Sequence, residues 1–462
     1  MDRKILLNNI AVPGIRSFAV YRSNGGYQSV EKALKRMTPD EVIEEVKKSG
    51  LRGRGGAGFP AGMKWSFINK KSEKPCYLIC NADESEPGTF KDRFLMEKIP
   101  HILIEGMIGA SYALGANTAY IYVRGEYKYL IGILNVAIRE AYRNGFLGKN
   151  ILGSSYSLDI HVHSGAGAYI CGEETAMIES LEGKRGNPRI KPPFPAVIGL
   201  YGCPTVVNNV ETLANVGFII NNGGSEYARY GTGKSTGTKL ISACGNINNP
   251  GVYEIELGLS VREFIYNEKY CGGIKDGKEL KAVIAGGSSV PILPKDLILQ
   301  TAAGEERLMT YESLAEGGFV SGTSLGSGGF IVYDEDACIV RNTWNLARFY
   351  HHESCGQCSP CREGTGWMEN VLHRIETGKG RMKDIDLLVS IANKIEGNTI
   401  CPLGDAAAWP VASAIRHFRH EFEEHVLHPE KCKNPSLQRT RSNGFAIRWH
   451  KFTSGLQIHW SV

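Results

Sequence analysis

The sequence predicts an α/β domain, followed by a small α+β module and a helical domain. Short apolar segments alternate with helical segments over residues 30–235, as in a parallel α/β domain. From residue 237 the chain shows short strands joined by Asn-Pro-Gly and Gly-Gly turns, and from residue 335 it shows helical periodicity. We therefore predict domains at residues 1–236, 237–333 and 334–430, followed by a basic tail at residues 431–462 that we expect to be poorly ordered.

Capping residues, apolar runs and turn residues predict the individual helices and strands along the chain. Residues 28–50 predict two helices, the second with Thr38 as N-cap, Pro39 in its first turn and Gly50 after its end. The apolar run at residues 75–85 ends in polar and acidic side chains, which is typical of a buried strand that delivers a loop. A helix at 101–116, a strand at 118–126, a helix at 129–145 and a strand, glycine turn and helix at 158–183 come next, then short strands within 238–265 and 281–293, and helices within 337–380, 382–397 and 410–426.

Composition and charge argue against a nucleic-acid-binding protein and against a protein that spans a membrane. The 462 residues are 42% hydrophobic and 22% charged, as in globular domains. The net charge of +5 is concentrated in the basic tail, and the remaining 47 basic and 48 acidic residues nearly balance, which argues against a nucleic-acid-binding protein. No apolar run reaches about 18 residues and the N-terminus lacks a signal-peptide core. We therefore expect a cytoplasmic protein with no membrane span of its own.

Four of the twelve cysteines form a metal-binding pattern. Cys355, Cys358 and Cys361 form C-x2-C-x2-C, and Cys401 stands much later in the chain beside Pro402. Three closely spaced thiolates with one remote Cys-Pro suit a [4Fe-4S] cluster. Zinc also takes four thiolates, but usually from two separated C-x2-C pairs. The pattern favours an iron–sulfur cluster for electron transfer, with zinc or structural thiols as the alternatives.

A glycine-rich segment, LRGRGGAGFPAGMKW at residues 51–65, matches G-x-G-x-x-G. A dinucleotide fingerprint needs a strand before the glycines and a helix after them, whereas the residues before 51 predict a helix and Pro60 interrupts the segment after the glycines. We favour a loop whose backbone lies against a flat or anionic ligand, with the fingerprint or a flexible turn as alternatives. The candidates are Gly53, Arg54, Gly55, Gly56 and Gly58 for close approach, Lys64 and the arginines for charge, and Phe59 and Phe67 for stacking on a planar ring.

Three further groups of polar residues are weak signals one by one. Each group also has an explanation without a ligand. The acidic residues after the 75–85 strand could form a solvent-exposed turn, and those at the start of the helix in 158–183 could interact favourably with the helix dipole. Combined in one chain with the glycine loop and the cysteine motif, they indicate a nucleotide site. The groups are Asn81, Asp83, Glu84 and Glu86, then Gly172, Glu173 and Glu174, and then Asn208 and Asn209 as expected N-caps, with Phe194 on a stiff proline-rich segment.

Seven motifs, in order, closely resemble one family. They are LRGRGGAGFPAGMKW, CNADESEPGTFKDR, GAGAYICGEETA, GNPRIKPPFPA, PTVVNNVETLANV, ESCGQCSPCREGTGW and CPLGDAAAWPV. They resemble the NADH-binding, flavin-carrying subunit of respiratory NADH:quinone oxidoreductase (complex I), called the F subunit in bacteria and the 51 kDa flavoprotein in mitochondria. The resemblance spans residues 30–428 and implies a Rossmann-like FMN/NADH domain, a ubiquitin-like SLBB module and a helical bundle with one [4Fe-4S] cluster.

The resemblance also implies roles for individual residues. The glycine loop with Lys64 would lie against FMN and NADH, and Glu84 and Glu86 could influence flavin protonation. Phe59, Phe67 and Phe194 would stack on the NADH adenine, while Glu86 and Glu174 would touch NADH and Glu174 would repel the extra phosphate of NADPH. The FMN site would contain Asn81, Asp83, Tyr169, Gly172, Glu173, Asn208, Asn209 and Thr212, and the cluster would be held by Cys355, Cys358, Cys361 and Cys401.

The implied activity is NADH dehydrogenation by an electron-input subunit. The expected partners are a 24 kDa-type [2Fe-2S] subunit and the large iron–sulfur subunit of the peripheral arm. These would attach the chain to the cytoplasmic face of the inner membrane and carry electrons to quinone. The alternative is the diaphorase subunit of an NADH-linked hydrogenase or formate dehydrogenase, and a non-enzymatic zinc protein is the rival from another class.

Overall fold

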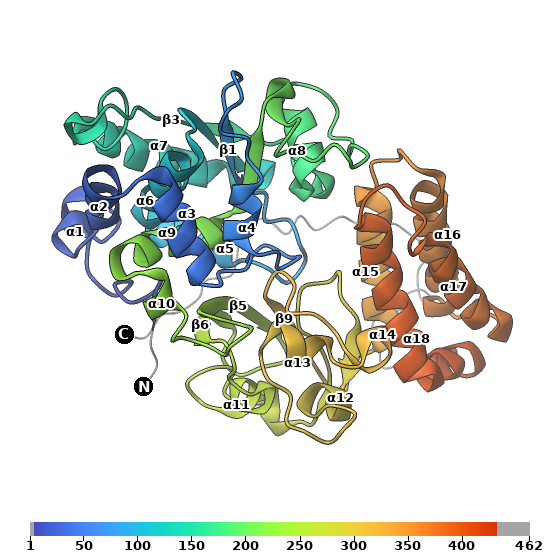
Figure 1. The fold of residues 1–462 in the computed structure, drawn as a ribbon. Helices are drawn as coiled ribbons and strands as arrows, with labels where there is room; N and C mark the ends of the chain where they lie inside the picture. The colour runs from blue at the N-terminus through green and yellow to red at the C-terminus, as the bar shows by residue number, and fades with distance from the viewer. Residues whose placement is uncertain (1–3, 432–462) are drawn as a thin grey trace.

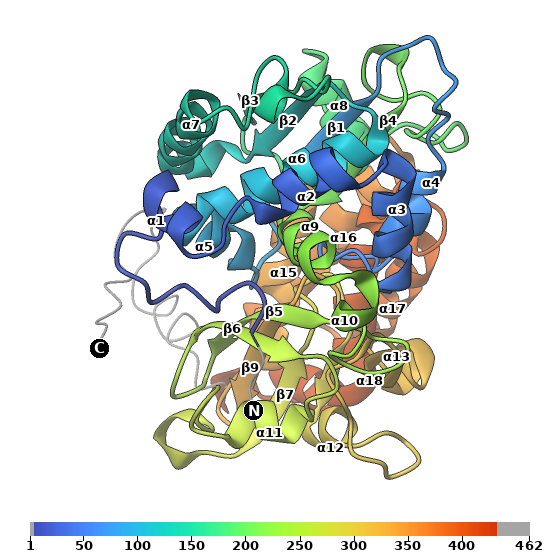
Figure 2. The ribbon, with the colours of Figure 1, turned by 60° about the vertical axis from the view of Figure 1, so that its left-hand side comes forward.

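The computed structural model describes residues 4–431, and the predicted poorly ordered tail lies outside the described residues except for Lys431. Figures 1 and 2 show three parts along the chain: an α/β part, a smaller sheet-containing part and a helical part. In residues 4–431, no helix is both long and apolar enough to cross a membrane. The division into domains at residues 236/237, 333/334 and 430/431 stays a proposal.

A four-stranded parallel sheet forms the centre of the first part. Its order is β3-β2-β1-β4, with β1 at Tyr77–Ala82, β2 at Thr118–Val123, β3 at Asp159–Ser164 and β4 at Thr205–Asn209. β4 is a strand that the sequence analysis did not anticipate. Since all four strands run the same way, their carboxyl ends lie along one edge, where α/β proteins place their ligands.

Helices cover both faces of this sheet. One face packs on α6 (Pro100–Leu114), α7 (Lys128–Arg143) and α9 (Val210–Asn222), and the other faces α8 (Glu174–Leu181) and the helical part. The alternation of strand side chains separates the two cores, because Leu78 lies in the first and Ile79 in the second. The other helices of this part are α1 (Phe18–Ser23), α2 (Gln28–Arg36), α3 (Pro39–Lys48), α4 (Ala61–Ser66), α5 (Lys91–Lys98) and α10 (Gly224–Tyr227).

The expected capping signals direct the chain into the glycine loop. Thr38 caps α3, and its side chain forms a capping box with Glu41. Gly50, with φ of 64°, comes after the end of α3 and leads directly into residues 51–65. Pro60 does not end a helix here but stands at the N-cap of the short helix α4, where its missing N–H costs nothing. The loop therefore connects helix to helix, which confirms that it is not a strand–turn–helix fingerprint.

The second part contains a mixed five-stranded sheet, which confirms the predicted small α+β module. Its order is β6-β5-β9-β7-β8, and only β5 and β9 pair in parallel. The strands are β5 (Thr238–Gly245), β6 (Gly251–Glu256), β7 (Leu280–Ile284), β8 (Ile292–Pro294) and β9 (Gly329–Asp334), with short helices α11 (Val261–Tyr266), α12 (Lys295–Leu299), α13 (Tyr311–Ala315) and α14 (Gly318–Ser321).

The third part is a four-helix bundle, as expected from its helical periodicity. It consists of α15 (Ile339–Glu353), α16 (Ser359–Glu376), α17 (Met382–Ile395) and α18 (Leu403–Leu427). Its core is continuous with that of α8 and one face of the first sheet, so the bundle is packed onto the α/β part. Short 3-10 helices elsewhere lie at Gly125–Tyr127, Ile151–Gly153, Tyr169–Gly172, Leu200–Gly202, Lys275–Gly277 and Pro429–Lys431.

Candidate functional site

A single large cleft collects most of the predicted site residues. Its volume is about 1390 Å³, and its walls come from all three parts of the chain. Pockets for one small ligand usually have about 300–1,000 Å³, so this cleft has room for two. The predicted residues that line it are Gly53, Gly55, Gly56, Gly58, Phe59, Lys64, Phe67, Asn81, Asp83, Glu84, Glu86, Tyr169, Gly172, Glu173, Glu174, Phe194, Asn208, Asn209, Thr212 and the cluster candidate Cys401.

The glycine loop forms one wall of the cleft with its backbone. The Gly53 N–H donates to the carbonyl of Phe59 at 2.9 Å, and the Arg54 N–H donates to the Thr212 hydroxyl at 2.8 Å. A Cβ at Gly55 would lie 2.8 Å from the Asn209 Cβ, closer than side chains tolerate. A Cβ at Gly56 would meet no protein atom within 4 Å. Gly55 is therefore required by packing against the protein, and Gly56 leaves open space at the cleft.

The arginines of the loop do not supply charge to the cleft, contrary to the sequence-based expectation. The Arg54 side chain is fully buried, and its guanidinium donates to the carbonyls of Thr236 at 2.8 Å and Thr238 at 3.1 Å. Arg52 pairs instead with Glu312 at 2.7 Å. Guanidinium forks fit carbonyl-lined sites well, and here they anchor the loop to the second part of the chain. A motif match alone does not reveal which way such a side chain points.

Polar side chains at the carboxyl ends of β1 and β4 fix the opposite wall. The Asn81 side chain donates to the Gly172 carbonyl at 2.8 Å, which joins β1 to the turn before α8. Asn209 caps α9 as expected, accepting from the Glu211 N–H at 3.0 Å. Asn208 is not an N-cap, because it lies within β4 and its oxygen accepts from the Trp65 indole at 2.7 Å. The expectation of two caps is therefore correct for one asparagine only.

Burial shifts the acidic groups after β1 toward their neutral forms. Burial raises the pKa of Asp83 to about 7 and that of Glu84 to about 7, the latter with a further contribution from Asp92. Glu84 accepts from the N–H groups of Asp92 and Arg93 at the start of α5, at 2.7 and 2.9 Å. The cleft thus holds two carboxyl groups that titrate near neutral pH.

Glu86 is held by donors from two parts of the chain. It accepts from the Tyr169 hydroxyl at 2.6 Å, the Ser288 hydroxyl at 2.9 Å and the Ser289 N–H at 2.7 Å. Burial raises its pKa, although these hydrogen bonds oppose the shift. No sequence pattern points to the two serines, because their contact with Glu86 joins residues about 200 positions apart.

Glu174 lies between two lysines. The Lys64 ammonium is 2.8 Å from one of its oxygens, and the Lys191 ammonium is 2.9 Å from the other. Burial alone would raise the pKa of Glu174, but the two lysines outweigh it and lower the pKa to about 2. Lys191 also pairs with Glu173, whose carboxylate caps α8 by accepting from the Thr175 and Ala176 N–H groups. Lys191 was missed from sequence because it stands in a proline-rich segment without regular periodicity.

Three aromatic side chains at the cleft are exposed to solvent. Phe59 is 46% exposed, and Phe67 and Phe194 are each 55% exposed. The rings of Phe59 and Phe67 have centroids 6.2 Å apart. Exposed phenylalanines around an apolar cleft are available to stack on a planar ligand.

The four motif cysteines converge where the bundle meets the cleft. Cys355 and Cys358 lie between α15 and α16, Cys361 lies in the first turn of α16, and Cys401 stands just before α18. Burial raises the pKa of Cys361 to about 11 and that of Cys401 to about 12, and in both cases neighbouring thiols of this group add to the effect. The four thiols are therefore near one another although Cys401 is remote in sequence.

The spacing of these sulfurs distinguishes a cluster from a single zinc ion. A tetrahedral zinc site with Zn–S bonds of about 2.3 Å places its sulfurs about 3.8 Å apart. In residues 4–431, no three of the four sulfurs lie within 4.8 Å of one another. A cube of iron and sulfide binds each thiolate through a different iron and needs wider spacing. The spacing therefore argues against a single zinc ion, and the donor set of three closely spaced thiols and one remote Cys-Pro is that of a [4Fe-4S] cluster.

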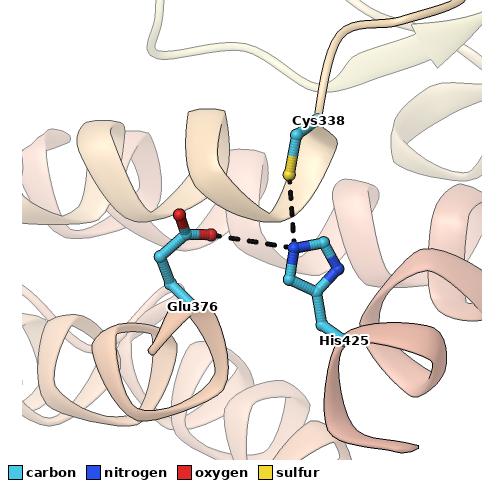
Figure 3. A group of neighbouring side chains, drawn as sticks. All are labelled: Cys338, Glu376 and His425. Carbon is cyan, nitrogen blue, oxygen red and sulfur yellow. Dashed lines mark hydrogen bonds and ion pairs between the residues drawn. The ribbon is translucent and has the colours of Figure 1, made fainter. Parts of the chain in front are cut away.

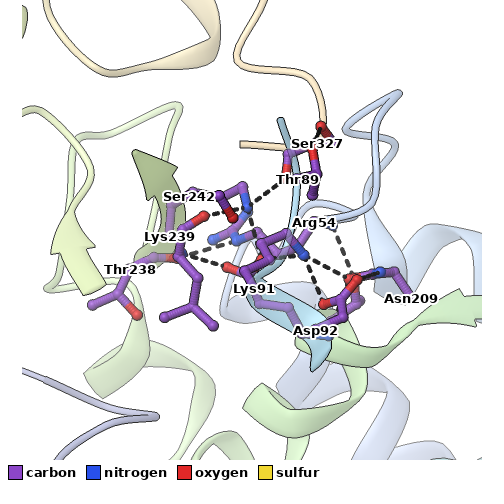
Figure 4. A network of polar contacts seen from close by, with 12 residues as sticks. Arg54, Thr89, Lys91, Asp92, Asn209, Thr238, Lys239, Ser242 and Ser327 are labelled. Atoms are coloured by element: carbon purple, nitrogen blue, oxygen red, sulfur yellow. Dashed lines mark hydrogen bonds and ion pairs between the residues drawn. The ribbon is translucent and has the colours of Figure 1, made fainter. Parts of the chain in front are cut away.

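A buried charge network, two of whose members (Lys91 and Asp92) line the cleft, has no counterpart among the sequence predictions (Figure 4). The ammonium groups of Lys91 and Lys239 lie 2.8 and 2.7 Å from the same Glu211 oxygen, and Lys91 also lies 2.8 Å from Asp92. Burial lowers the pKa of Lys239 to about 7. Asn209 donates to Asp92 at 2.6 Å, which connects this network to the cleft wall.

Three family models match the chain in the order of its three parts. The Nuo51 FMN-binding domain matches residues 46–217, the SLBB domain matches residues 239–339, and the NADH-ubiquinone oxidoreductase-F iron-sulfur binding region matches residues 341–425. Fold and site together define a class of protein that carries a flavin and an iron–sulfur cluster. This confirms the predicted fold class and the predicted cofactors, FMN and a [4Fe-4S] cluster.

Curated relatives narrow the class further. The chain is 51% identical over 427 residues to F subunit 2 of the NADH-quinone oxidoreductase of Rhizobium meliloti (strain 1021), covering 92% of this chain and 98% of the relative. It is 54% identical over 396 residues to the NADH-quinone oxidoreductase F subunit of Rickettsia felis (strain ATCC VR-1525 / URRWXCal2), covering 86% and 91%. The chain belongs to the family of NADH-quinone oxidoreductase F subunits. This membership confirms the predicted resemblance and the predicted function of an NADH dehydrogenase component.

A solved structure of a hydrogenase shares the fold of this chain. The NAD+-reducing [NiFe]-hydrogenase in the H2-reduced state matches with a TM-score of 0.78 and 35% identity, over 92% of this chain and 67% of that chain. Its identity to this chain is lower than that of the two NADH-quinone oxidoreductase relatives. The hydrogenase-type diaphorase therefore remains the alternative that the sequence analysis named.

Proposed function

We propose that the cleft binds FMN and NADH together and that electrons leave it through a cluster held by Cys355, Cys358, Cys361 and Cys401. One observation carries this proposal: Cys401, the remote member of the cluster motif, lines the same cleft as the glycine loop. Bound FMN would supply the means to accept two electrons from NADH and pass them on singly, as a [4Fe-4S] acceptor requires. The protein contributes by binding, orienting and tuning these groups.

On the flavin side, backbone and short polar side chains provide the contacts. The glycine loop offers open space at Gly56, where no Cβ blocks approach to a flat ring. Asp83 and Glu84, whose pKa values lie near 7, can hold or release a proton next to a bound flavin at neutral pH. We assign the FMN site to Asn81, Asp83, Tyr169, Gly172, Glu173, Asn208, Asn209 and Thr212, all of which line the cleft.

On the nucleotide side, the exposed phenylalanines provide stacking surfaces. We propose that Phe59, Phe67 and Phe194 hold the adenine of NADH, since aromatic stacking on a base contributes about 1–3 kcal/mol. Glu86 and Glu174 would contact the rest of the dinucleotide. Glu174 stays ionised at neutral pH because its pKa is about 2, so it would repel the 2′-phosphate of NADPH.

Membership in this family also suggests which larger complex the chain belongs to. The relatives are subunits of NADH-quinone oxidoreductases, and in residues 4–431 no helix can span a membrane. We propose that this chain belongs to the peripheral arm of such a complex, next to a 24 kDa-type [2Fe-2S] subunit and the large iron–sulfur subunit. These partners would attach it to the cytoplasmic face of the inner membrane and carry its electrons to quinone.

A matched pair of cysteine variants tests the proposal. We expect anaerobically purified protein to release FMN on denaturation, to contain about four iron atoms per chain, and to reduce ferricyanide with NADH. Cys401→Ser should lose most of the iron, whereas Cys244→Ser, a half-buried cysteine on β5, should keep it. A colourless protein without flavin or NADH-dependent activity, or a Cys401→Ser variant with full iron content, would refute the proposal.

A further inference from the structure

Three side chains outside the cleft converge at one end of the helical bundle (Figure 3). Cys338 is the residue before α15, Glu376 is the last residue of α16, and His425 lies in the last turn of α18. Their sulfur, oxygen and nitrogen atoms all lie within 4.8 Å of one another. None of the three lines the cleft or belongs to the four-cysteine motif.

The histidine orients a lone pair toward the other two groups. Its Nδ1 lies 2.9 Å from the carbonyl oxygen of Glu421, which can only accept a hydrogen bond, so Nδ1 carries the proton. The other nitrogen, Nε2, then faces Cys338 Sγ at 3.4 Å and Glu376 Oε2 at 3.8 Å with its lone pair. A backbone carbonyl bonded to the far nitrogen is the usual second partner of a metal-bound histidine.

The same geometry excludes a nucleophilic triad. In a triad the acid binds the nitrogen opposite the one that faces the nucleophile. Here Cys338 and Glu376 both approach Nε2, and the opposite nitrogen is occupied by a backbone carbonyl. The arrangement is that of three ligands around a shared centre rather than of a proton relay.

Burial raises the pKa of Glu376, but two contacts stabilise the anionic forms that a metal needs. Cys338 is the N-cap of the fifteen-residue helix α15, and its sulfur accepts from the Arg341 N–H at 3.4 Å. A helix N-terminus stabilises a thiolate. Glu376 uses Oε1 to contact the Arg341 guanidinium at 3.3 Å, while Oε2 is the oxygen directed at His425. Glu421, the other acid nearby, pairs with Lys281 at 3.3 Å.

We propose that Cys338, Glu376 and His425 bind one zinc ion. With Zn–S of about 2.3 Å and Zn–N or Zn–O of about 2.0–2.2 Å, a tetrahedral site places neighbouring ligand atoms about 3.4–3.6 Å apart. The Sγ–Nε2 separation of 3.4 Å lies in this range, whereas the Oε2–Nε2 separation of 3.8 Å and the remaining Sγ–Oε2 separation, within 4.8 Å, would close by rotation of the side chains. Thiolate, imidazole and carboxylate are all zinc ligands, and water would complete the coordination. The ion would join the start of α15 to the ends of α16 and α18.

Zinc-edge X-ray absorption on the full chain, with FMN and cluster in place, tests the proposal without interference from their colour. We expect about one zinc per chain after exposure to Zn²⁺ and dialysis, with one sulfur and otherwise nitrogen or oxygen ligands. Cys338→Ser and His425→Gln should each lower the zinc content at least fivefold. The matched controls Cys244→Ser and His351→Gln, the latter removing another His–Glu pair of the bundle, should retain it.

Iron content reports whether each variant still folds, because the cluster cysteines belong to the same bundle. His425→Cys supplies a second check, since a thiolate at this position should restore zinc binding and raise the sulfur count to two. The proposal fails if wild-type protein holds no zinc, if its zinc has four sulfur ligands as in the cluster motif, or if zinc persists in Cys338→Ser. It also fails if a folded His425→Cys variant binds no zinc.

Discussion

Lys64 and Glu174 bridge two walls of the cleft, with Nζ 2.8 Å from a carboxylate oxygen. Lys64 belongs to the end of the glycine-rich segment, and Glu174 begins α8, so this contact ties two motifs that lie about 110 residues apart. The Lys191 ammonium lies 2.9 Å from the other oxygen of the Glu174 carboxylate. The carboxylate of Glu174 thus neutralises two cations that would otherwise attract a phosphate.

Glu174→Gln should therefore increase the use of NADPH. The variant removes the negative charge that repels the 2′-phosphate and leaves Lys64 and Lys191 without their shared carboxylate. We expect kcat/KM for NADPH to rise about tenfold, equivalent to about 1.4 kcal/mol. Steady-state oxidation of NADPH and NADH measures the ratio. Glu179→Gln, which breaks ion pairs with Arg189 and Lys184 outside the cleft, is the control and should leave the ratio unchanged.

Phe194→Ala should weaken NADH binding without loss of flavin. The ring is 55% exposed at the cleft, so its removal takes away a stacking surface and disturbs little of the core. We expect KM for NADH to rise about tenfold, within the roughly 1–3 kcal/mol that stacking on a base contributes. Tyr129→Ala, at an exposed position on α7, should leave KM unchanged. An unaltered KM in Phe194→Ala would exclude this ring from the nucleotide site.

Sequence patterns predict most of the helices and strands and many residues of the cleft, but not β4, and the difference has a physical reason. Caps such as Thr38, apolar strands and closely spaced cysteines are local features, and local chemistry determines them. The direction of Arg54 and the position of Asn208 within β4 depend on packing between distant segments. The pairing of Lys91 and Lys239 with Glu211 likewise joins separate elements, and no spacing rule links such residues.

Asp83→Asn should stabilise the flavin-free protein, and increasingly so as the pH rises. Burial raises the pKa of Asp83 from 3.8 to about 7, so the folded state binds its proton more tightly than the unfolded state does. Stability from this group is therefore fully present at low pH and is lost as the pH rises from about 4 to about 7. Thermal unfolding at pH 5 and pH 8 should show a larger advantage of the variant at pH 8. The exposed Asp276→Asn, at a left-handed backbone position, should have the same effect at both pH values, and an equal advantage of Asp83→Asn at both pH values would contradict the prediction.

Glu211→Gln should strongly destabilise the fold. The carboxylate is fully buried between the ammonium groups of Lys91 and Lys239, and glutamine preserves its shape and can still accept from the Leu240 N–H. Removing one partner of a buried ion pair leaves an uncompensated charge, which costs about 3–5 kcal/mol. Thermal unfolding measures the loss, and a variant that melts with the wild type would show that the network contributes nothing.

The pH dependence of Glu211→Gln identifies which charge causes the loss. Burial lowers the pKa of Lys239 from 10.5 to about 7, so the folded state binds this proton more weakly than the unfolded state does. The free energy of unfolding therefore decreases as the pH falls from about 10.5 to about 7. Without the Glu211 carboxylate that opposes this shift, the pKa should fall further and the cost of keeping Lys239 charged should rise. We therefore expect the loss of stability to be larger at pH 6 than at pH 9. Adding Lys239→Met should recover part of it, because that substitution removes the unpaired ammonium while keeping an apolar stem of similar length.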